Sequence, residues 1–217
     1  VILQGSSCKS ARADHQKYQI PINAMNMAIV TVEKRGFPSA DSNPCPTEYL
    51  ENNTVDDRVN DYLTVVADLH SRAAGWNQQV IWIGGSEGAT VAALVAPKAS
   101  ETVATVLIAG GGGMTMANEI VLLTEKDLRS KGASDAEVQN ATRELNAQIQ
   151  EIFANPTSSK SWLGETNTYK WWAAILPKDS FSALKELKTP LYIVQGTKDT
   201  SVPVESADLL VKKLREL

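Results

Sequence analysis

The sequence has 217 residues, of which 43% are hydrophobic and 21% charged, and its formal net charge is −4 at pH 7. It is long enough for one well-buried α/β domain or two small ones, and its composition is ordinary for a globular protein. The negative charge and the lack of a basic run exclude a general attraction to nucleic acid, and no apolar stretch reaches the ~18 residues that span a bilayer. Two cysteines and two histidines form no ligand pattern, so we expect no metal site.

Apolar segments rich in β-branched residues predict the strands of one sheet. They cover residues 1–4, 27–32, 80–83, 103–109 and 191–195. Continuous apolar strands, rather than alternating ones, indicate a sheet buried on both faces, hence parallel with helices outside. Apolar residues at helical spacing from Val55 to Ala73 predict a crossover helix, which Thr54 and Asp57 open as an N-cap pair. We therefore predict an α/β fold with a mostly parallel, doubly wound sheet.

A long segment without strand-like runs interrupts this alternation before the last predicted strand. Residues 114–180 instead predict helices at 117–131, 134–153 and 169–176. Because these helices are short or polar, we expect a helical cap over the edge of the sheet rather than a separate domain. The core of the fold then comprises residues 1–113 and 181–217.

The pentapeptide Gly84-Gly85-Ser86-Glu87-Gly88 stands between the predicted strand and a helix-forming segment, residues 89–96. A G-x-S-x-G sequence in this context is typical of a nucleophile elbow, a tight turn that holds a serine in a strained conformation with its hydroxyl exposed. The first and last glycines are needed because a side chain there would collide with the neighbouring strand or helix. We expect Ser86 to be the nucleophile, and a small residue in a Gly-rich turn is the alternative.

Two N–H donors aimed at one oxygen stabilise the tetrahedral intermediate of acyl transfer. We expect the first to be the backbone amide of Glu87, whose carboxylate we interpret as incidental. The second is expected from the loop after the first strand, Gln4-Gly5-Ser6-Ser7-Cys8. Within it the amide of Ser6 is preferred and that of Ser7 is next, while a plain Gly-Ser turn is the alternative.

The acid is expected at the end of the last predicted strand. Asp199 follows residues 191–195 and so lies at the carboxyl edge of the sheet, where open α/β folds place their sites. The order serine, then aspartate is also the chain order that accompanies this kind of elbow. An aspartate that caps the helix starting near Pro203 is the alternative, and both roles can coexist.

The general base is missing from the expected place, because a histidine should follow the aspartate and none follows Asp199. His70 is predicted on the crossover helix, far from the sheet edge, and His15 lies at the correct edge but out of order. The sequence begins within a strand and ends within a predicted helix, residues 204–217, that has no capping residue. We expect a segment missing at each end, with the histidine beyond Leu217, and little activity without it.

Other residues support weaker predictions. Trp171 and Trp172 could line an acyl pocket under the cap, and packing of the cap itself is the alternative. Residues 110–113 are all glycine but lack the spacing of a dinucleotide site, so we expect them to leave room beside the nucleophile, and we expect no cofactor. Basic residues that follow strands could favour an anionic substrate, although we favour a solvated rim: Lys9, Arg12, Lys34 and Arg35.

These motifs together resemble the α/β-hydrolase superfamily over essentially the whole sequence. Within it the chain is similar to a bacterial group of serine hydrolases near the bile-acid-acyltransferase and dipeptidyl-peptidase branches. The shared stretches are Gln4 to Cys8, Thr31 to Lys34, Gly84 to Gly88, Gly111 to Met116 and Tyr169 to Trp172. The resemblance implies a periplasmic or secreted protein, and with it a disulfide between Cys8 and Cys45, while a cytoplasmic protein with two free thiols is the alternative.

The function we predict is that of a serine hydrolase. Ser86 attacks an ester, thioester or amide of a small-molecule acyl substrate, and Asp199 orients the histidine. A non-catalytic ligand-binding protein of the same fold is one alternative, because the histidine is missing. An acyltransferase that uses the same nucleophile is another.

Overall fold

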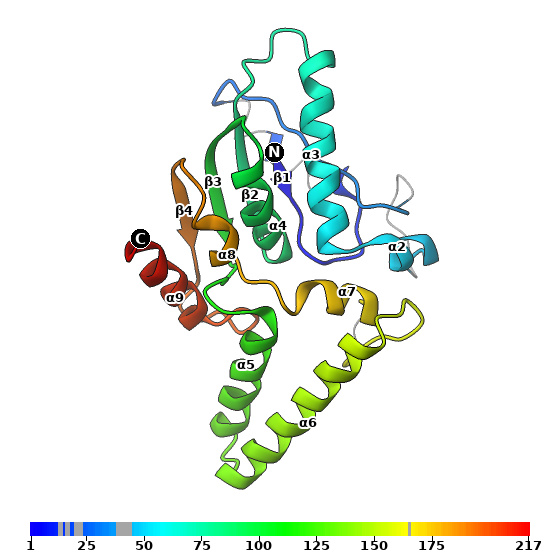
Figure 1. Ribbon diagram of the computed structural model, residues 1–217, viewed down its shortest axis with the longest axis vertical. Coiled ribbons are helices and arrows are strands. Elements are labelled where there is room, and N and C mark those ends of the chain that lie inside the picture. The colour runs from blue at the N-terminus through cyan, green and yellow to red at the C-terminus, as the bar shows by residue number, and fades with distance from the viewer. Residues whose placement is uncertain (13–14, 16–17, 20–23, 38–44, 165) are drawn as a thin grey trace.

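The structure, a computed structural model, describes residues 1–12, 15, 18–19, 24–37, 45–164 and 166–217. Its centre is a parallel sheet whose strands lie side by side in the order β1-β2-β3-β4 (Figure 1). The strands are β1 (Ile2–Leu3), β2 (Val80–Gly85), β3 (Thr102–Ile108) and β4 (Leu191–Val194). The predicted α/β class and parallel sheet are confirmed.

The predicted strand at residues 27–32 is reduced to a single bridge. Thr31 pairs with Ile2 in the parallel sense, and the amide of Ile2 donates to the carbonyl of Val30 at 3.0 Å. The segment therefore lies beside β1, at the edge of the sheet. Because β1 has only two residues, it offers too short a ladder for a second full strand.

Helices lie at the predicted positions 55–73, 89–96, 117–131, 134–153, 169–176 and 204–217, and the structure adds short helices at 47–52 and 181–184 and a 3-10 turn at 96–98, which were not predicted. They are α2 (Thr47–Asn52), α3 (Val55–Arg72), α4 (Glu87–Val95), a 3-10 turn η1 (Ala96–Lys98), α5 (Met116–Ser130), α6 (Asp135–Ala154), α7 (Tyr169–Ile175), α8 (Phe181–Leu184) and α9 (Val204–Arg215). The side chain of Thr54 accepts a hydrogen bond from the amide of Asp57, so the predicted N-cap of α3 is confirmed. Ser134 and Glu137 form a capping box at the start of α6.

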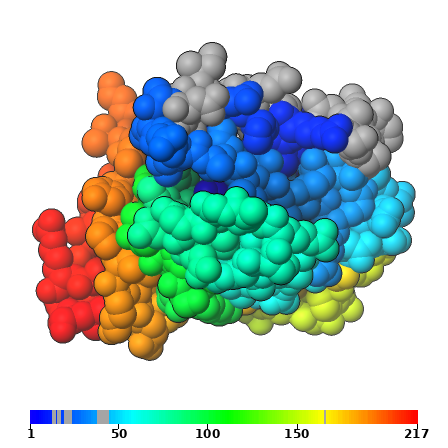
Figure 2. All heavy atoms as spheres, turned by 90° about the horizontal axis from the view of Figure 1, so that it is seen from above, coloured from blue at the N-terminus to red at the C-terminus, as the bar shows by residue number. Residues whose placement is uncertain are grey.

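The main core lies between the sheet and α4. This helix is apolar on all sides and packs against β2, β3 and α3. Trp82 of β2 is fully buried beneath it, and its indole N–H donates to Thr102 Oγ1 at 2.8 Å. On β4, by contrast, Tyr192 and Val194 are 58% and 54% exposed. The C-terminal segment with β4 and α9 is drawn orange and red, and it forms one flank of the molecule when seen from the end opposite the cap (Figure 2).

The segment predicted as a cap, for which we keep that name, comprises α5, α6 and α7 and lies at the carboxyl ends of the strands (Figure 1). The long helices α5 and α6 meet at their turn and spread apart toward the core, and α7 leads back to it (Figure 1). The cap has an apolar cluster of its own, with Leu145, Ile149, Ile152, Trp162, Tyr169 and Leu176 as its buried members. Among the described helices, none is both long and apolar enough to cross a membrane.

Candidate active site

The turn that carries Ser86 is as short as such a turn can be. Strand β2 ends at Gly85 and α4 begins at Glu87, so Ser86 alone connects them, with φ 54° and ψ −127°. This left-handed conformation is strained for a residue with a side chain. The amide of Ser86 donates to the carbonyl of Ile108 at 3.0 Å, which anchors the turn to β3. Ser86 is exposed, and its hydroxyl has no hydrogen-bond partner in the described part of the chain.

The glycines on either side of the serine have the steric role expected of them. A Cβ atom at Gly84 would lie 2.0 Å from the carbonyl oxygen of Gly88. A Cβ atom at Gly88 would lie 2.1 Å from the carbonyl oxygen of Leu3. Helix α4 therefore starts directly against β1 and β2, which is what lifts Ser86 clear of the sheet.

The loop of residues 4–8, which we call the oxyanion loop, lies against the elbow. A Cβ atom at Gly5 would stand 3.4 Å from Ser86 Cβ and 3.8 Å from Ser86 Oγ. Side chains from outside the loop bind each of its carbonyl groups from residue 4 to residue 7. The pairs are Arg58 Nη2 with Gln4 (2.7 Å), Lys34 Nζ with Gly5 (2.7 Å) and Ser7, and Tyr49 Oη with Ser6 (3.2 Å).

The carboxylate of Glu87 has a structural role that the sequence analysis did not expect. It is buried and forms an ion pair with Arg58, with 3.1 Å between Oε1 and Nη1. The indole N–H of Trp171 donates to the same oxygen at 3.3 Å. Our interpretation of this carboxylate as incidental was wrong, because a fully buried charge needs a partner and Arg58 of α3 supplies it.

Asp199 lies in the loop after β4, at the same edge of the sheet as Ser86. Its Oδ1 accepts hydrogen bonds from the amides of Ser201 and Val202, at 2.9 and 3.0 Å, and its Oδ2 accepts one from Gln195 Nε2 at 3.1 Å. The carboxylate thus stabilises the turn in which it lies. It does not cap α9, because the N-cap residue of that helix is Pro203 and no side chain there makes a capping hydrogen bond. Since β3 lies between β2 and β4, two strand spacings, about 10 Å, separate the strand ends from which Ser86 and Asp199 come.

Neither histidine is seen to contact Ser86 or Asp199. His70 Nε2 bonds to the carboxylate of Glu101, which precedes β3 at the opposite edge of the sheet, and this bond lowers the pKa of Glu101. The predicted location of His70, far from the catalytic edge, is confirmed. His15 follows the oxyanion loop in the sequence and is half-buried, and it forms no hydrogen bond within the described residues.

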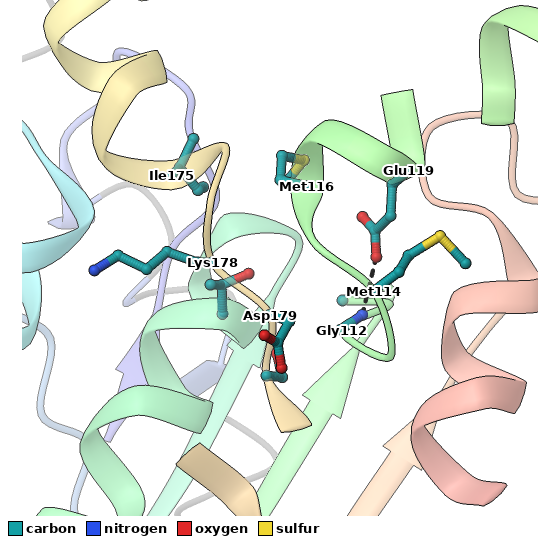
Figure 3. Close-up of a pocket in the computed structure, with 10 residues that line it drawn as sticks. Gly112, Met114, Met116, Glu119, Ile175, Lys178 and Asp179 are labelled. Atoms are coloured by element: carbon teal, nitrogen blue, oxygen red, sulfur yellow. Dashed lines mark hydrogen bonds between the residues drawn. The ribbon is translucent and has the colours of Figure 1, made fainter. Parts of the chain in front are cut away.

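A narrow pocket lies between the start of α5 and the end of α7, beside the glycine-rich segment after β3 (Figure 3). It has room for about one water molecule. Glu119 faces it and accepts a hydrogen bond from the amide of Gly112 at 3.0 Å (Figure 3). It also accepts one from the hydroxyl of Ser206. Burial raises the pKa of Glu119 despite these two bonds. The sequence carries no signal for this residue, because an acid in the first turn of a helix is ordinary.

The three tryptophans of the cap, Trp162, Trp171 and Trp172, pack against one another. Trp171 and Trp172 are in edge-to-face contact with centroids 4.6 Å apart, and Trp162 contacts Trp172 at 4.9 Å. Trp171 is only 4% exposed and bonds to Glu87. Cap packing, the alternative interpretation, is therefore present, and a contact with substrate stays a prediction.

Two of the basic residues expected on a solvated rim make specific contacts instead. Lys34 is buried under the oxyanion loop, so the expectation was wrong for it. Arg35 is exposed but pairs with Asp57 and Asp61 of α3, each at 2.8 Å. The resemblance-based disulfide is confirmed: Cys8 and Cys45 are bonded, with their Cα atoms 6.0 Å apart.

No family model and no curated protein matches the sequence. Solved structures match in fold. An esterase of Pyrococcus furiosus superposes with a TM-score of 0.61 at 16% identity, over 99% of this chain and 67% of the esterase. A monoacylglycerol lipase of Paleococcus ferrophilus does so with a TM-score of 0.61 at 12% identity, over 99% of this chain and 79% of the lipase. A lipase-esterase related protein of Clostridium acetobutylicum gives 0.57 at 16% identity, over 99% and 80% of the two chains.

The topology and the serine turn together define the class of protein, an α/β fold with a strand-serine-helix elbow at the carboxyl edge of a parallel sheet. The superpositions specify it further: this chain has the α/β-hydrolase fold. At these identities the similarity establishes the fold, and the activity has to be argued from the site.

Proposed function

We propose that this protein is a serine hydrolase that forms an acyl-enzyme on Ser86. The observation that carries the proposal is the exposed hydroxyl of Ser86 in a strained turn, with Gly5 packed against it and no hydrogen-bond partner among the residues that the structure describes. A serine in this geometry presents its oxygen to a carbonyl group from outside while the adjoining backbone amides remain close to the reacting atom. The esterase and lipase names of the structural neighbours agree with this chemistry.

The proposed reaction uses Ser86, two backbone amides, an imidazole and Asp199. Ser86 Oγ attacks the acyl carbon, and the amides of Ser6 and Glu87 stabilise the oxyanion that forms. An imidazole takes the serine proton and returns it to the leaving alcohol, thiol or amine, and water then releases the acyl group. Asp199 orients this imidazole. The strand ends from which Ser86 and Asp199 come are two strand spacings apart, about 10 Å, and an imidazole would bridge this gap.

We further propose that the imidazole comes from a histidine outside these 217 residues. His70 is bound at the opposite edge of the sheet, so it does not serve. His15 remains the internal candidate, because it follows the oxyanion loop. Replacing His15 with Ala in the natural-length protein separates the two: activity is retained if the base is external and lost if His15 supplies it.

The substrate class we propose is a small-molecule ester, thioester or amide. The disulfide between Cys8 and Cys45 suits an oxidising compartment, and we propose that the protein is exported. Fractionation of the source cells tests export directly, since a cytoplasmic protein with free thiols would contradict it.

The function is tested by incubating the natural-length protein with a fluorophosphonate and measuring its intact mass. One adduct per chain is expected, and none in Ser86→Ala. Ser7→Ala is the matched control, because Ser7 is also an exposed serine near the elbow but is not the proposed nucleophile. An unlabelled but folded wild-type protein would contradict the hydrolase proposal and favour a binding protein. If acyl groups pass to an added alcohol or amine faster than to water, the protein is an acyltransferase with the same nucleophile.

A further inference from the structure

Lys34 occupies an unusual position for a lysine. Its side chain is buried, with the residue 4% exposed, and its ammonium group donates to the carbonyl oxygens of Gly5, at 2.7 Å, and Ser7. Its ammonium also lies 5.9 Å from the centre of the Tyr49 ring. A buried ammonium is costly unless its donors are satisfied, so these contacts hold the loop and the lysine in one arrangement.

The carbonyl that Lys34 binds determines where a neighbouring amide points. In a planar trans peptide the C=O of one residue and the N–H of the next point in opposite directions. With the carbonyl of Gly5 turned toward Lys34, the N–H of Ser6 is turned away from it. Gly5 itself lies against Ser86, since its Cβ position is 3.8 Å from Ser86 Oγ.

This peptide would be free to turn over without such a contact. Gly5 has no side chain to restrict its backbone, and the amide of Ser6 has no acceptor in the described part of the chain. A turned peptide would present a carbonyl oxygen to the reacting centre instead of an N–H. That oxygen would repel the oxyanion that forms there.

We propose that Lys34 is a positioning residue for the oxyanion hole: it holds the Gly5–Ser6 peptide in the orientation that presents the Ser6 amide beside Ser86. The proposal rests on the proposed hydrolase function. Tyr49 supports the same arrangement one peptide further on, because its hydroxyl donates to the carbonyl of Ser6 at 3.2 Å. The positive charge of Lys34 is then used inside the protein and is not available to an anionic substrate.

The test is Lys34→Met in the natural-length protein, with a fluorophosphonate and a chromogenic ester as probes. We expect kcat and the rate of Ser86 phosphonylation to fall about 100-fold or more, the effect of losing one oxyanion donor, while KM changes less than about threefold. Lys34→Arg, which keeps a charged donor, should recover at least a tenth of the activity. Lys170→Met is the matched control. Lys170 also donates to a backbone carbonyl, that of Glu51 in α2 and not of the oxyanion loop, and its loss should change kcat less than twofold.

Failure of this proposal is distinguishable from failure of the proposed function. An unlabelled wild-type protein overturns the function, whereas a labelled wild type with an equally active, folded Lys34→Met variant overturns only the role of Lys34. If Lys34→Met does not fold, a crystal structure of the phosphonylated wild-type protein decides. The proposal requires the Ser6 amide within about 3 Å of the phosphonyl oxygen and the Gly5 carbonyl on Lys34. A Gly5 carbonyl facing the phosphonyl group would overturn it.

Discussion

Arg58 and Glu87 form an ion pair inside the protein, next to Ser86, with their side chains only 4% and 2% exposed. Arg58 belongs to α3 and also binds the carbonyl of Gln4, while Glu87 begins α4 and also binds Trp171 of the cap. The pair therefore connects the crossover helix, the oxyanion loop, the elbow and the cap.

We expect Arg58→Met to lower the free energy of unfolding by about 3–5 kcal/mol, because it leaves the Glu87 carboxylate buried without its partner. The double variant Arg58→Met, Glu87→Leu should cost less than Arg58→Met alone, since no charge is then left unpaired. Urea unfolding of the wild type, both single variants and the double variant gives the comparison. If the double variant lost as much free energy of unfolding as the two single variants together, this would contradict the coupling between Arg58 and Glu87. Arg35→Met is the control, because its pairs are on the surface and should contribute less than about 1 kcal/mol.

Glycine substitutions should separate packing from catalysis at the elbow. Gly88→Ala should lower the free energy of unfolding by about 3 kcal/mol, because its methyl group would meet the carbonyl of Leu3 at 2.1 Å. Gly5→Ala should change stability by less than about 1 kcal/mol, since its nearest neighbour would be 3.4 Å away. Its methyl group would nonetheless stand 3.8 Å from Ser86 Oγ, where the substrate approaches. We expect kcat/KM of Gly5→Ala to fall about tenfold or more, and full activity would contradict this geometry.

Reduction of the disulfide should destabilise the protein. Cys8 and Cys45 are 37 residues apart, and closing such a loop contributes about 4 kcal/mol in the chain-entropy model. We expect the wild type to lose about 2–4 kcal/mol on reduction, measured by urea unfolding with and without reductant. The variant Cys8→Ala, Cys45→Ala should resemble the reduced wild type and be indifferent to reductant. A wild type equally indifferent would show that the bridge is not formed.

Glu119 should make stability depend on pH. Burial raises its pKa above the 4.5 of an unperturbed glutamate, so between pH 4.5 and the folded pKa the native state keeps a proton that the unfolded chain has released. Stability from this group is therefore present at low pH, falls as pH rises through that window, and stays reduced above the folded pKa. Glu119→Gln removes the ionisation and keeps an oxygen for Gly112 and Ser206. The free energy of unfolding of Glu119→Gln, relative to that of the wild type, should rise from about pH 4 to pH 7. A difference that stays constant with pH would refute the raised pKa of Glu119.

Local sequence patterns were sufficient for the elbow and for most of the helices and strands. The strand, the G-x-S-x-G turn and the helix around Ser86 are contiguous in the chain. Glycine is required at positions 84 and 88 because the backbone there approaches neighbouring backbone closely. The cap helices were likewise predicted to within two residues at each end, because their periodicity and capping residues are local. The strand at residues 27–32 was overpredicted, since a strand's length depends on the partner beside it.

The support beneath the site was decided only by the tertiary structure. From the sequence alone, Lys34 is interpreted as a surface charge after a strand and Glu87 as an incidental acid. Arg58 is only one position of a predicted amphipathic helix. Each is buried only because segments 27 to 54 residues apart in the sequence come together around the oxyanion loop and elbow. By itself the sequence determined which backbone would carry the serine, because steric limits act between neighbouring residues. The partners of buried charges depend on long-range packing, which only the folded chain establishes.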